Sequence, residues 1–254
     1  MAIGYDPSLL VATAAAEDNH FWYRARNDII VTAAATAAPT LRRGGRLVEV
    51  GCGNGSVLTA LAREFPRASV VGLERLAAGA RLARERAVAP TAVCDAVNLP
   101  LRSGVDLMCA FDLIEHLDDD EGALRAMRAA LTETSGRLLL TVPAGPELWS
   151  EFDVASGHRR RYSQRSLEAV VERAGFDVRY LTHFMTILYP VARLRRKAPG
   201  RRSAMDADVV EAELKVSRSV NRMLFHALRQ ERRAVARRWS LGLGTSLLCE
   251  AAVK

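Results

Sequence analysis

Long hydrophobic runs are absent from this 254-residue sequence. The most apolar uncharged stretch, residues 180–192, contains a proline and is too short to cross a bilayer, which takes about 20 apolar residues in a helix. The first residues, Met-Ala-Ile-Gly-Tyr-Asp, also lack the basic flank and apolar run of a signal peptide. We therefore expect neither a transmembrane helix nor a secretory leader.

Cysteine is scarce, and its few copies are scattered. Cys52, Cys94, Cys109 and Cys249 lie in apolar runs, and no two of them form a Cys-x-x-Cys pair. This pattern favours buried thiols in a reducing compartment over a disulfide framework or a cysteine metal site. No cluster of His, Asp and Glu has the ligand spacing of a metal site either. We therefore expect a cytoplasmic protein that requires no metal.

The composition is that of a globular protein with one basic region. Hydrophobic residues make up 49% and charged residues 26%, which supplies a sizeable core and excludes a disordered chain. The net charge of +7 is uneven, because residues 190–240 carry 14 Lys and Arg against 5 Asp and Glu. The basic balance therefore belongs to this segment and does not indicate nucleic-acid binding by the rest of the chain.

Short β-like runs alternate with helical ones from residue 46 onward. Such alternation predicts an α/β fold, in which a parallel sheet carries helices on both faces. The expected strands are 46–50, 69–73, 91–94, 105–111, 136–142 and 176–182, and the expected helices are 56–64, 77–87, 118–131 and 165–174.

The alternation stops after residue 182. An apolar piece is followed by a basic linker at 193–202 and by a long amphipathic helix with Val210, Leu214, Leu224 and Leu228 on one stripe. Residues 241–253 return to strand composition. We expect N-terminal lid helices (1–45), a core (46–182), a basic helical insertion or lid (183–240), and a last antiparallel strand that rejoins the core (241–254).

A glycine loop, Glu49-Val50-Gly51-Cys52-Gly53-Asn54-Gly55, follows the first expected strand. Glycines here allow a sharp turn and a close approach to a ligand. Ser56 stands where a dinucleotide fingerprint needs its third glycine, and no Lys-Ser/Thr follows as in a P-loop. The Glu49 carboxylate would repel a pyrophosphate at the helix N-terminus but suits a ligand with an ammonium and a sulfonium group.

Acidic residues also follow the second and third expected strands. Glu74 can accept hydrogen bonds from both hydroxyls of a ribose. Asp95 can accept one from the amine of adenine, and Ala96 offers a backbone donor. Acids at the carboxyl ends of three neighbouring strands thus describe a site for adenosine joined to an amino acid.

These residues resemble those of the class I S-adenosylmethionine-dependent methyltransferases of the small-molecule type. The resemblance covers residues 47 to about 182 and includes Asp95-Ala96-x-x-Leu99-Pro100 and Phe111-Asp112-Leu113-Ile114-Glu115-His116. It implies a Rossmann-like, doubly wound sheet of seven strands with the last one antiparallel, and S-adenosylmethionine as the cofactor. The cofactor-binding residues it suggests are Arg26, Glu49, Gly51, Cys52, Gly53, Gly55, Glu74, Arg75, Asp95, Ala96, Phe111, Asp112 and His116.

The resemblance also narrows the methyl acceptor. Methyltransferases of adenine and glutamine carry Asn/Asp-Pro-Pro-Tyr/Phe where this chain has Phe111-Asp112-Leu113-Ile114, so a hydroxyl acceptor is favoured, and it needs a general base. His158 and His116 are the candidates, with Asp153 orienting His158. The alternative is that His158 only anchors its loop.

The segment His20-Phe21-Trp22-Tyr23-Arg24 is expected in a helix before the first strand. In similar proteins an arginine there pairs with the methionine carboxylate, and Arg26 is the first choice before Arg24. The alternative is an aromatic staple that packs the helix on the sheet. The residues expected to line the acceptor pocket are Trp22, Trp149, Tyr162, Phe184, Met185 and Tyr189.

The basic insertion admits two interpretations. It acts either as a lid over the acceptor, which we favour, or as a peripheral contact with an anionic membrane. Nucleic-acid binding is not expected, because aromatic residues do not alternate with the arginines. The sequence thus predicts an O-methyltransferase for a small molecule such as a natural product, sugar, quinone or lipid-linked acceptor. The alternatives are an RNA methyltransferase and a catalytically silent S-adenosylmethionine-binding regulator, and the oligomeric state is left open.

Overall fold

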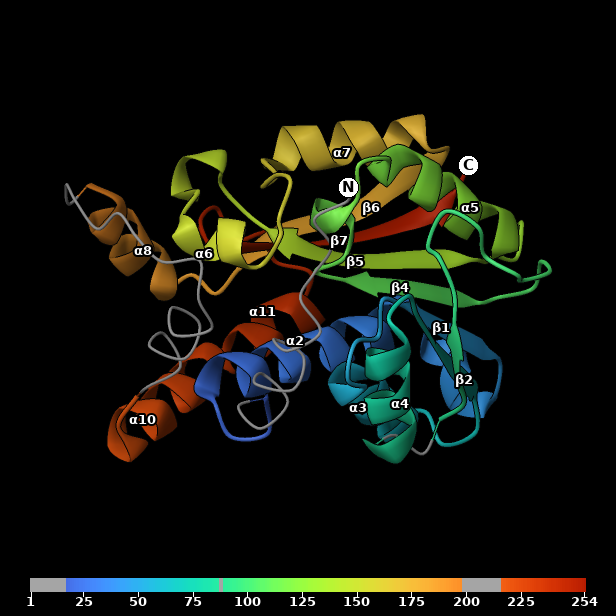
Figure 1. Cartoon of the computed structure of the whole chain (residues 1–254), viewed down its shortest axis with the longest axis horizontal. Coiled ribbons are helices and arrows are strands. Elements are labelled where there is room, and N and C mark those ends of the chain that lie inside the picture. The colour runs from blue at the N-terminus through green and yellow to red at the C-terminus, as the bar shows by residue number, and fades with distance from the viewer. Residues whose placement is uncertain (1–16, 87–88, 198–215) are drawn as a thin grey trace.

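A single mixed sheet forms the centre of the molecule in the computed structural model (Figure 1). The structure describes residues 17–86, 89–197 and 216–254. The strand order is β3-β2-β1-β4-β5-β7-β6, with β1 to β5 parallel and β7 antiparallel to both β5 and β6. This confirms the predicted doubly wound sheet with an antiparallel last strand.

The strands lie close to where the sequence predicts them. Their bounds are β1 Arg46–Val50, β2 Ser69–Glu74, β3 Thr91–Val93, β4 Leu107–Phe111, β5 Arg137–Pro143, β6 Phe176–Phe184 and β7 Ser246–Val253. Every residue of β4 is buried, and so are all but one each in β5 and β7. Strands covered by helices on both faces are continuously apolar in this way.

Helices cover both faces of the sheet. They are α2 Phe21–Ala37, α3 Ser56–Glu64, α4 Ala77–Arg86, α5 Asp120–Ala130, α6 Glu151–Ala155, α7 Gln164–Arg173, α8 Leu188–Lys197, α10 Arg218–Leu228 and α11 Glu231–Ala236, with short 3-10 turns η1 Pro39–Arg43, η2 Ile114–His116 and η3 Pro146–Leu148. Helix α7 begins after its cap Ser163, whose hydroxyl accepts from the Ser166 N–H.

Two apolar clusters form the core, one on each face of the sheet. One contains residues of α2, α3, α10 and α11, and the other contains residues of α5 and α7. Figure 1 shows the same layers, with α5 and α7 above the sheet and α2, α10 and α11 below it. Helix α2 packs against α10 and α11, so segments from opposite ends of the chain meet on one face.

The segment after β6 differs from the sequence prediction. Residues 193–197 form the last turns of α8 and not a linker, because Leu, Arg and Lys are good helix formers. Residues 198–202, Val210 and Leu214 lie outside the described residues. Leu224 and Leu228 belong to α10, which ends at Leu228 before the separate helix α11. In the described part of the chain, no helix is long and apolar enough to cross a membrane.

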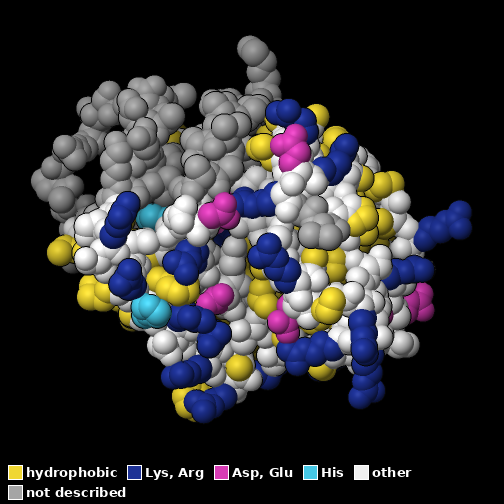
Figure 2. All heavy atoms as spheres, turned by 90° about the horizontal axis from the view of Figure 1, so that it is seen from below, with side chains coloured by type: hydrophobic (Ala, Val, Ile, Leu, Met, Phe, Trp, Pro, Cys, Tyr) yellow, Lys and Arg dark blue, Asp and Glu magenta, His cyan; other side chains and the backbone are white. Residues whose placement is uncertain are grey.

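Basic side chains are spread over the face seen in Figure 2. Lys and Arg alternate there with hydrophobic and uncharged side chains, and acidic groups lie between them. Some arginines of the described chain form ion pairs, as Arg42 does with Glu64 and Arg229 does with Asp28. On this face the positive charge is therefore distributed and partly neutralised.

Gly55 supports the turn from β1 into α3. Its backbone is left-handed, with φ of 80°, and an added Cβ would lie 2.9 Å from Cα of Ala83 in α4. We expect Gly55→Ala to lower the free energy of unfolding by about 1–3 kcal/mol, because both the backbone conformation and the contact are unfavourable. Urea denaturation measures this change. Gly242→Ala is the control, since nothing lies within 4 Å of its added Cβ, and equal losses in both variants would contradict the prediction.

Candidate active site

A cavity of about 990 Å³ opens at the carboxyl ends of β1, β2 and β4. Ligands bind in this position in open α/β sheets, where the strand order reverses. Most of the predicted cofactor residues line the cavity, whereas Gly55 shapes the loop without lining it. Those that line it are Arg26, Glu49, Gly51, Cys52, Gly53, Glu74, Arg75, Asp95, Ala96, Phe111, Asp112 and His116.

Glu49 is a buried carboxylate at the floor of this cavity. Its side chain is 2% exposed, and its Oε2 has no hydrogen-bond partner. Burial raises the pKa of Glu49 to about 8, against the opposing effect of Arg26, while Glu17 and Glu74 raise it further. The buried and unpartnered Oε2 of Glu49 is therefore suited to a ligand that brings a positive charge or a hydrogen-bond donor to it.

Glu74 is held in place by the glycine loop. Its Oε2 accepts from the Gly53 N–H at 2.9 Å, and its Oε1 accepts from the Leu76 N–H at 2.8 Å. Each oxygen retains capacity for a further donor. Asp95 lies beyond it on the exposed rim of the cavity, where its Oδ1 accepts from the Val97 N–H at 3.1 Å. The acids after β1, β2 and β3 thus follow one edge of the sheet, as the sequence predicts.

Arg26 reaches across the cavity to the end of β4. Its Nε donates to Asp112 Oδ2 at 2.7 Å, and its Nη2 lies 2.6 Å from the same oxygen. The guanidinium also lies 5.5 Å from the centroid of the Trp22 ring. Arg24, the second choice, is exposed and stacks over Phe225 outside the cavity lining. Of these two arginines, only Arg26 therefore lines the cavity.

Asp153 and His158, which the sequence analysis pairs, lie next to each other in the structure. His158 Nδ1 lies 2.8 Å from Asp153 Oδ1, which also accepts from Arg161 Nε at 2.7 Å. The amide and hydroxyl of Ser150 donate to Asp153 Oδ2. Burial alone would raise the pKa of Asp153, but these hydrogen bonds, first the one from His158, lower it to about 2. Asp153 is therefore a fixed negative charge behind the imidazole.

His116 lies beside His158. The two rings meet edge to face with their centroids 4.8 Å apart. Burial, with a further effect from His158, lowers the pKa of His116 to about 4, and a hydrogen bond to the backbone of Gly157 opposes this shift. His116 is therefore a neutral imidazole at pH 7 in the lining of the cavity.

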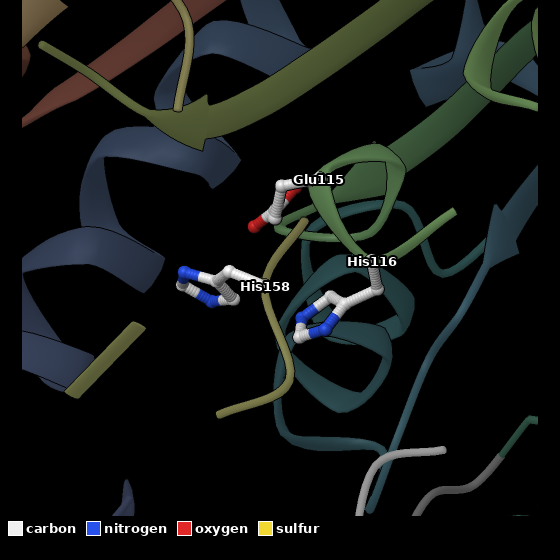
Figure 3. A group of neighbouring side chains, drawn as sticks. All are labelled: Glu115, His116 and His158. Carbon is white, nitrogen blue, oxygen red and sulfur yellow. The ribbon is translucent and has the colours of Figure 1, made fainter. Parts of the chain in front are cut away.

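Glu115 is a site residue that the sequence analysis did not single out. Its carboxylate is fully buried, and neither oxygen has a hydrogen-bond partner. Burial, followed by the charge of Asp112, raises its pKa well above the usual range. Figure 3 shows the carboxylate converging with the rings of His116 and His158. No local sequence pattern indicates that Glu115 is buried beside the two histidines, because a glutamate after a strand is ordinarily solvated.

The comparisons with known proteins agree with this geometry. Residues 21–181 match the family model described as a methyltransferase domain. The chain belongs to the methyltransferase-domain family. The methyl donor of this family is S-adenosylmethionine, and the enzyme is an S-adenosylmethionine-dependent methyltransferase. No curated protein matches the sequence significantly.

Solved structures show the same fold at low sequence identity. A TehB-like S-adenosylmethionine-dependent methyltransferase from Corynebacterium glutamicum is 16% identical, with a TM-score of 0.53 and 88% of each chain covered. Geranyl diphosphate C-methyltransferase from Streptomyces coelicolor is 16% identical, with a TM-score of 0.54, 83% of this chain and 74% of that chain covered. Phosphoethanolamine N-methyltransferase 2 from Haemonchus contortus is 20% identical, with a TM-score of 0.54 and coverage of 86% and 52%.

The predicted acceptor-pocket residues of this methyltransferase divide into two groups. Trp22 lines the cavity, and the other five do not. Phe184 and Met185 are fully buried in the core at the end of β6, and the Tyr162 hydroxyl donates to Asp120 at 2.6 Å. Trp149 is exposed, and Tyr189 points its hydroxyl at Glu147. The pocket prediction was therefore wrong for these five, because aromatic composition alone does not say which face of a segment turns inward.

Aliphatic residues from α8 and α10, and not the predicted aromatic residues, form an apolar wall of the methyltransferase cavity. They are Ile187, Leu188, Val191 and Ala192 at and within α8, and Val216, Val220 and Leu224 at and within α10. Val191 is 52% exposed and Val220 40%, so the wall presents apolar surface to the opening. Apolar residues at the 3.6-residue period of a helix indicated that these segments have an apolar face. The order of the segments along the chain did not indicate that the two faces meet over the site.

Proposed function

We propose that this methyltransferase transfers a methyl group to a hydroxyl oxygen of a small molecule. The observation that carries the proposal is the pair of Asp153 and His158 at the same cavity as the buried, unpartnered carboxylate of Glu49. The pair of Asp153 and His158 supplies a polarised base, and the Glu49 carboxylate fits a methyl donor that carries positive charge. S-Adenosylmethionine, when bound, supplies an electrophilic methyl group on a sulfonium.

We assign the cofactor contacts to residues that already face the cavity. The unpartnered Glu49 Oε2 fits the ammonium of the methionine part, because a buried carboxylate is most stable beside a cation. The fixed carboxylate of Glu74 fits the two ribose hydroxyls. Asp95 and the backbone of Ala96 fit the adenine. Arg26 fits the methionine carboxylate, with Asp112 holding the guanidinium in position.

The choice of oxygen rests on this chain's own residues. The similar structures include proteins named as a C-methyltransferase and an N-methyltransferase, so the fold does not select the acceptor atom. A hydroxyl holds its proton at neutral pH, and removing that proton during attack requires a base. With its proton on Nδ1 toward Asp153, His158 has Nε2 available for this task. Proximity and exclusion of water supply the rest of the rate enhancement.

The apolar wall from α8 and α10 favours an acceptor with an aliphatic or aromatic part. Ile187, Val191 and Val220 would bury such a part while its hydroxyl meets His158. Each square ångström of apolar surface removed from water contributes roughly 25 cal/mol to binding. A small polar acceptor such as a free sugar would leave this wall in water.

An acceptor screen tests the function. We expect release of S-adenosylhomocysteine with hydroxyl compounds that carry an apolar part, and little release with matched amines and carbon nucleophiles of the same skeleton. Calorimetry with S-adenosylmethionine alone tests the cofactor site separately. Turnover of the amine series and not of the hydroxyl series would contradict the proposal, as would binding of a dinucleotide in place of S-adenosylmethionine.

Arg26 offers a direct test of the cofactor assignment. Arg26→Ala is expected to weaken S-adenosylmethionine binding by about 10- to 100-fold, the value of a hydrogen bond between charged groups. Arg24→Ala is the matched control, since this arginine stacks on Phe225 outside the cavity lining. Calorimetry gives both dissociation constants, and thermal melting confirms that the variants fold. Equal affinities in the two variants would remove Arg26 from the site.

A further inference from the structure

The geometry points to a divalent metal site formed by Glu115, His116 and His158. One ligand atom from each side chain lies within 4.8 Å of the others. Figure 3 shows the Glu115 carboxylate and the two imidazole rings as close neighbours that come from two separate segments of the chain. All three residues line the cavity. The sequence analysis expected no metal because no group of residues has the spacing of metal ligands along the chain. Such spacing cannot reveal ligands that the fold brings together from two distant segments.

The state of Glu115 argues for a cation. A buried polar group is costly unless it is hydrogen-bonded or coordinates a metal, and both oxygens of this fully buried carboxyl group are unpartnered. The two nearby arginines are engaged elsewhere, since Arg26 pairs with Asp112 and Arg161 pairs with Asp153. Neither arginine is therefore free to pair with the Glu115 carboxyl group, and its two oxygens stay available to an ion beside the two imidazoles.

Both histidines have the outer-shell partners that metal ligands have. A ligating histidine almost always donates its second ring N–H to a carboxylate or a backbone carbonyl, which fixes its orientation. His158 has Asp153 in this role at 2.8 Å. His116 has a hydrogen bond to the backbone of Gly157. In each ring one nitrogen is thus fixed from behind, and for His158 the nitrogen left for an ion is Nε2.

The donor set selects the class of metal. Two imidazoles and one carboxylate suit Zn²⁺, Fe²⁺, Mn²⁺ or Co²⁺, whereas Mg²⁺ and Ca²⁺ prefer sites made of oxygen ligands. Three protein ligands leave positions open, as in catalytic metal sites and unlike closed structural ones. Because the ligands line the cavity, an open position would face a bound acceptor.

The role of the ion rests on the proposed methyl transfer, whereas its binding does not. A hydroxyl oxygen bound to a dication loses its proton more readily, as metal-bound water does. In this arrangement the acceptor O–H bond would break, with its proton passing to water, and the oxygen electron pair would form the bond to the methyl carbon. The bond between that carbon and the sulfonium sulfur would break at the same time, and its electron pair would leave on the sulfur of S-adenosylhomocysteine. His158 serves as a ligand and not as a base whenever the ion is bound.

Calorimetry with Zn²⁺ alone tests the site, after chelator treatment of the full-length protein. We expect one equivalent to bind and to raise the melting temperature. Glu115→Gln and His116→Asn should each weaken binding by at least about 10-fold, the minimum seen when even an outer-shell partner is lost. Co²⁺ should give the visible absorption of a nitrogen-ligated ion in the wild type only. The melting temperatures without metal show whether each variant folds.

The control is His226→Asn, because His226 is an exposed histidine on α10. It should bind Zn²⁺ as the wild type does. No binding by the wild type, or equal binding by the Glu115 and His116 variants, would overturn the site. S-Adenosylmethionine affinity is measured on the same samples without metal. Failure of the metal site with that affinity intact is thereby distinguished from failure of the methyltransferase assignment.

Discussion

Replacement of His158 by alanine is expected to lower kcat with a hydroxyl acceptor by about 100- to 10,000-fold, the contribution of a positioned general base. Affinity for S-adenosylmethionine should stay unchanged, because His158 lies on the acceptor side and none of the proposed cofactor contacts involves it. Single-turnover measurements of methyl transfer, with calorimetry of the cofactor, separate the two effects. Intact turnover with intact cofactor binding would show that His158 only anchors its loop.

Asp153→Asn tests the same base through its partner. Asparagine keeps the shape of the side chain but removes the charge that stabilises a protonated His158. The expected loss in kcat is smaller than for His158→Ala, because the imidazole is kept but no longer has a charged acceptor that holds its proton on Nδ1. If Asp153 has a merely structural role, Asp153→Asn should lower the melting temperature and leave the kcat of the folded variant unchanged. His183→Ala is the matched control, a half-buried histidine outside the cavity lining.

Glu115→Gln distinguishes the two roles proposed for His158, as a general base and as a metal ligand. This variant keeps the pair of His158 and Asp153 and removes the carboxylate ligand. If His158 acts as a base, chelator-treated wild type and Glu115→Gln retain turnover, and His158→Ala does not. If the ion activates the acceptor, both Glu115→Gln and chelation abolish turnover, and added Zn²⁺ or Mn²⁺ restores it only in the wild type.

The sheet was predictable because its signals are local. Apolar runs such as 107–111 are followed by turn residues and then by helical periodicity, and each signal lies within about a dozen residues. The position of Glu49, Glu74 and Asp95 along one edge of the sheet was predictable for a related reason. Parallel strands all end at the same edge, so knowing the strands is enough to place the acids that follow them.

The acceptor side was less predictable because it depends on contacts between distant segments. Arg26 meets Asp112 from a helix that precedes the sheet, and Glu115 meets His158 from another loop. No spacing in the sequence encodes such pairs. For the same reason, aromatic residues near position 184 looked like pocket walls, whereas Phe184 and Met185 complete the core.

Cofactor binding is expected to release close to one proton from the protein between about pH 5.5 and 7. The source is Glu49, whose pKa burial raises to about 8, so that it is protonated in the free protein. An ammonium beside the carboxylate favours its charged form and lowers this pKa. Affinity should therefore rise with pH by up to about 10-fold per unit through this window and level off toward pH 8. Calorimetry in buffers of different ionisation enthalpy counts the proton directly.

Glu49→Gln should remove both the proton release and the pH dependence, and it should leave the affinity below that of the wild type at pH 7. Glu17→Gln is the control, because burial also raises the pKa of Glu17 at the same cavity, and this variant should keep the proton release.

The pH dependence of stability gives an independent check on Glu49. A carboxyl group whose pKa is higher in the folded state stabilises the fold at low pH, and this contribution is lost as pH rises from about 4.5 toward 8. The free protein should lose stability over that range, and Glu49→Gln should lose less. If Glu49→Gln still releases a proton on binding, the ammonium does not lie against Glu49, and the orientation of the methionine part must be reversed.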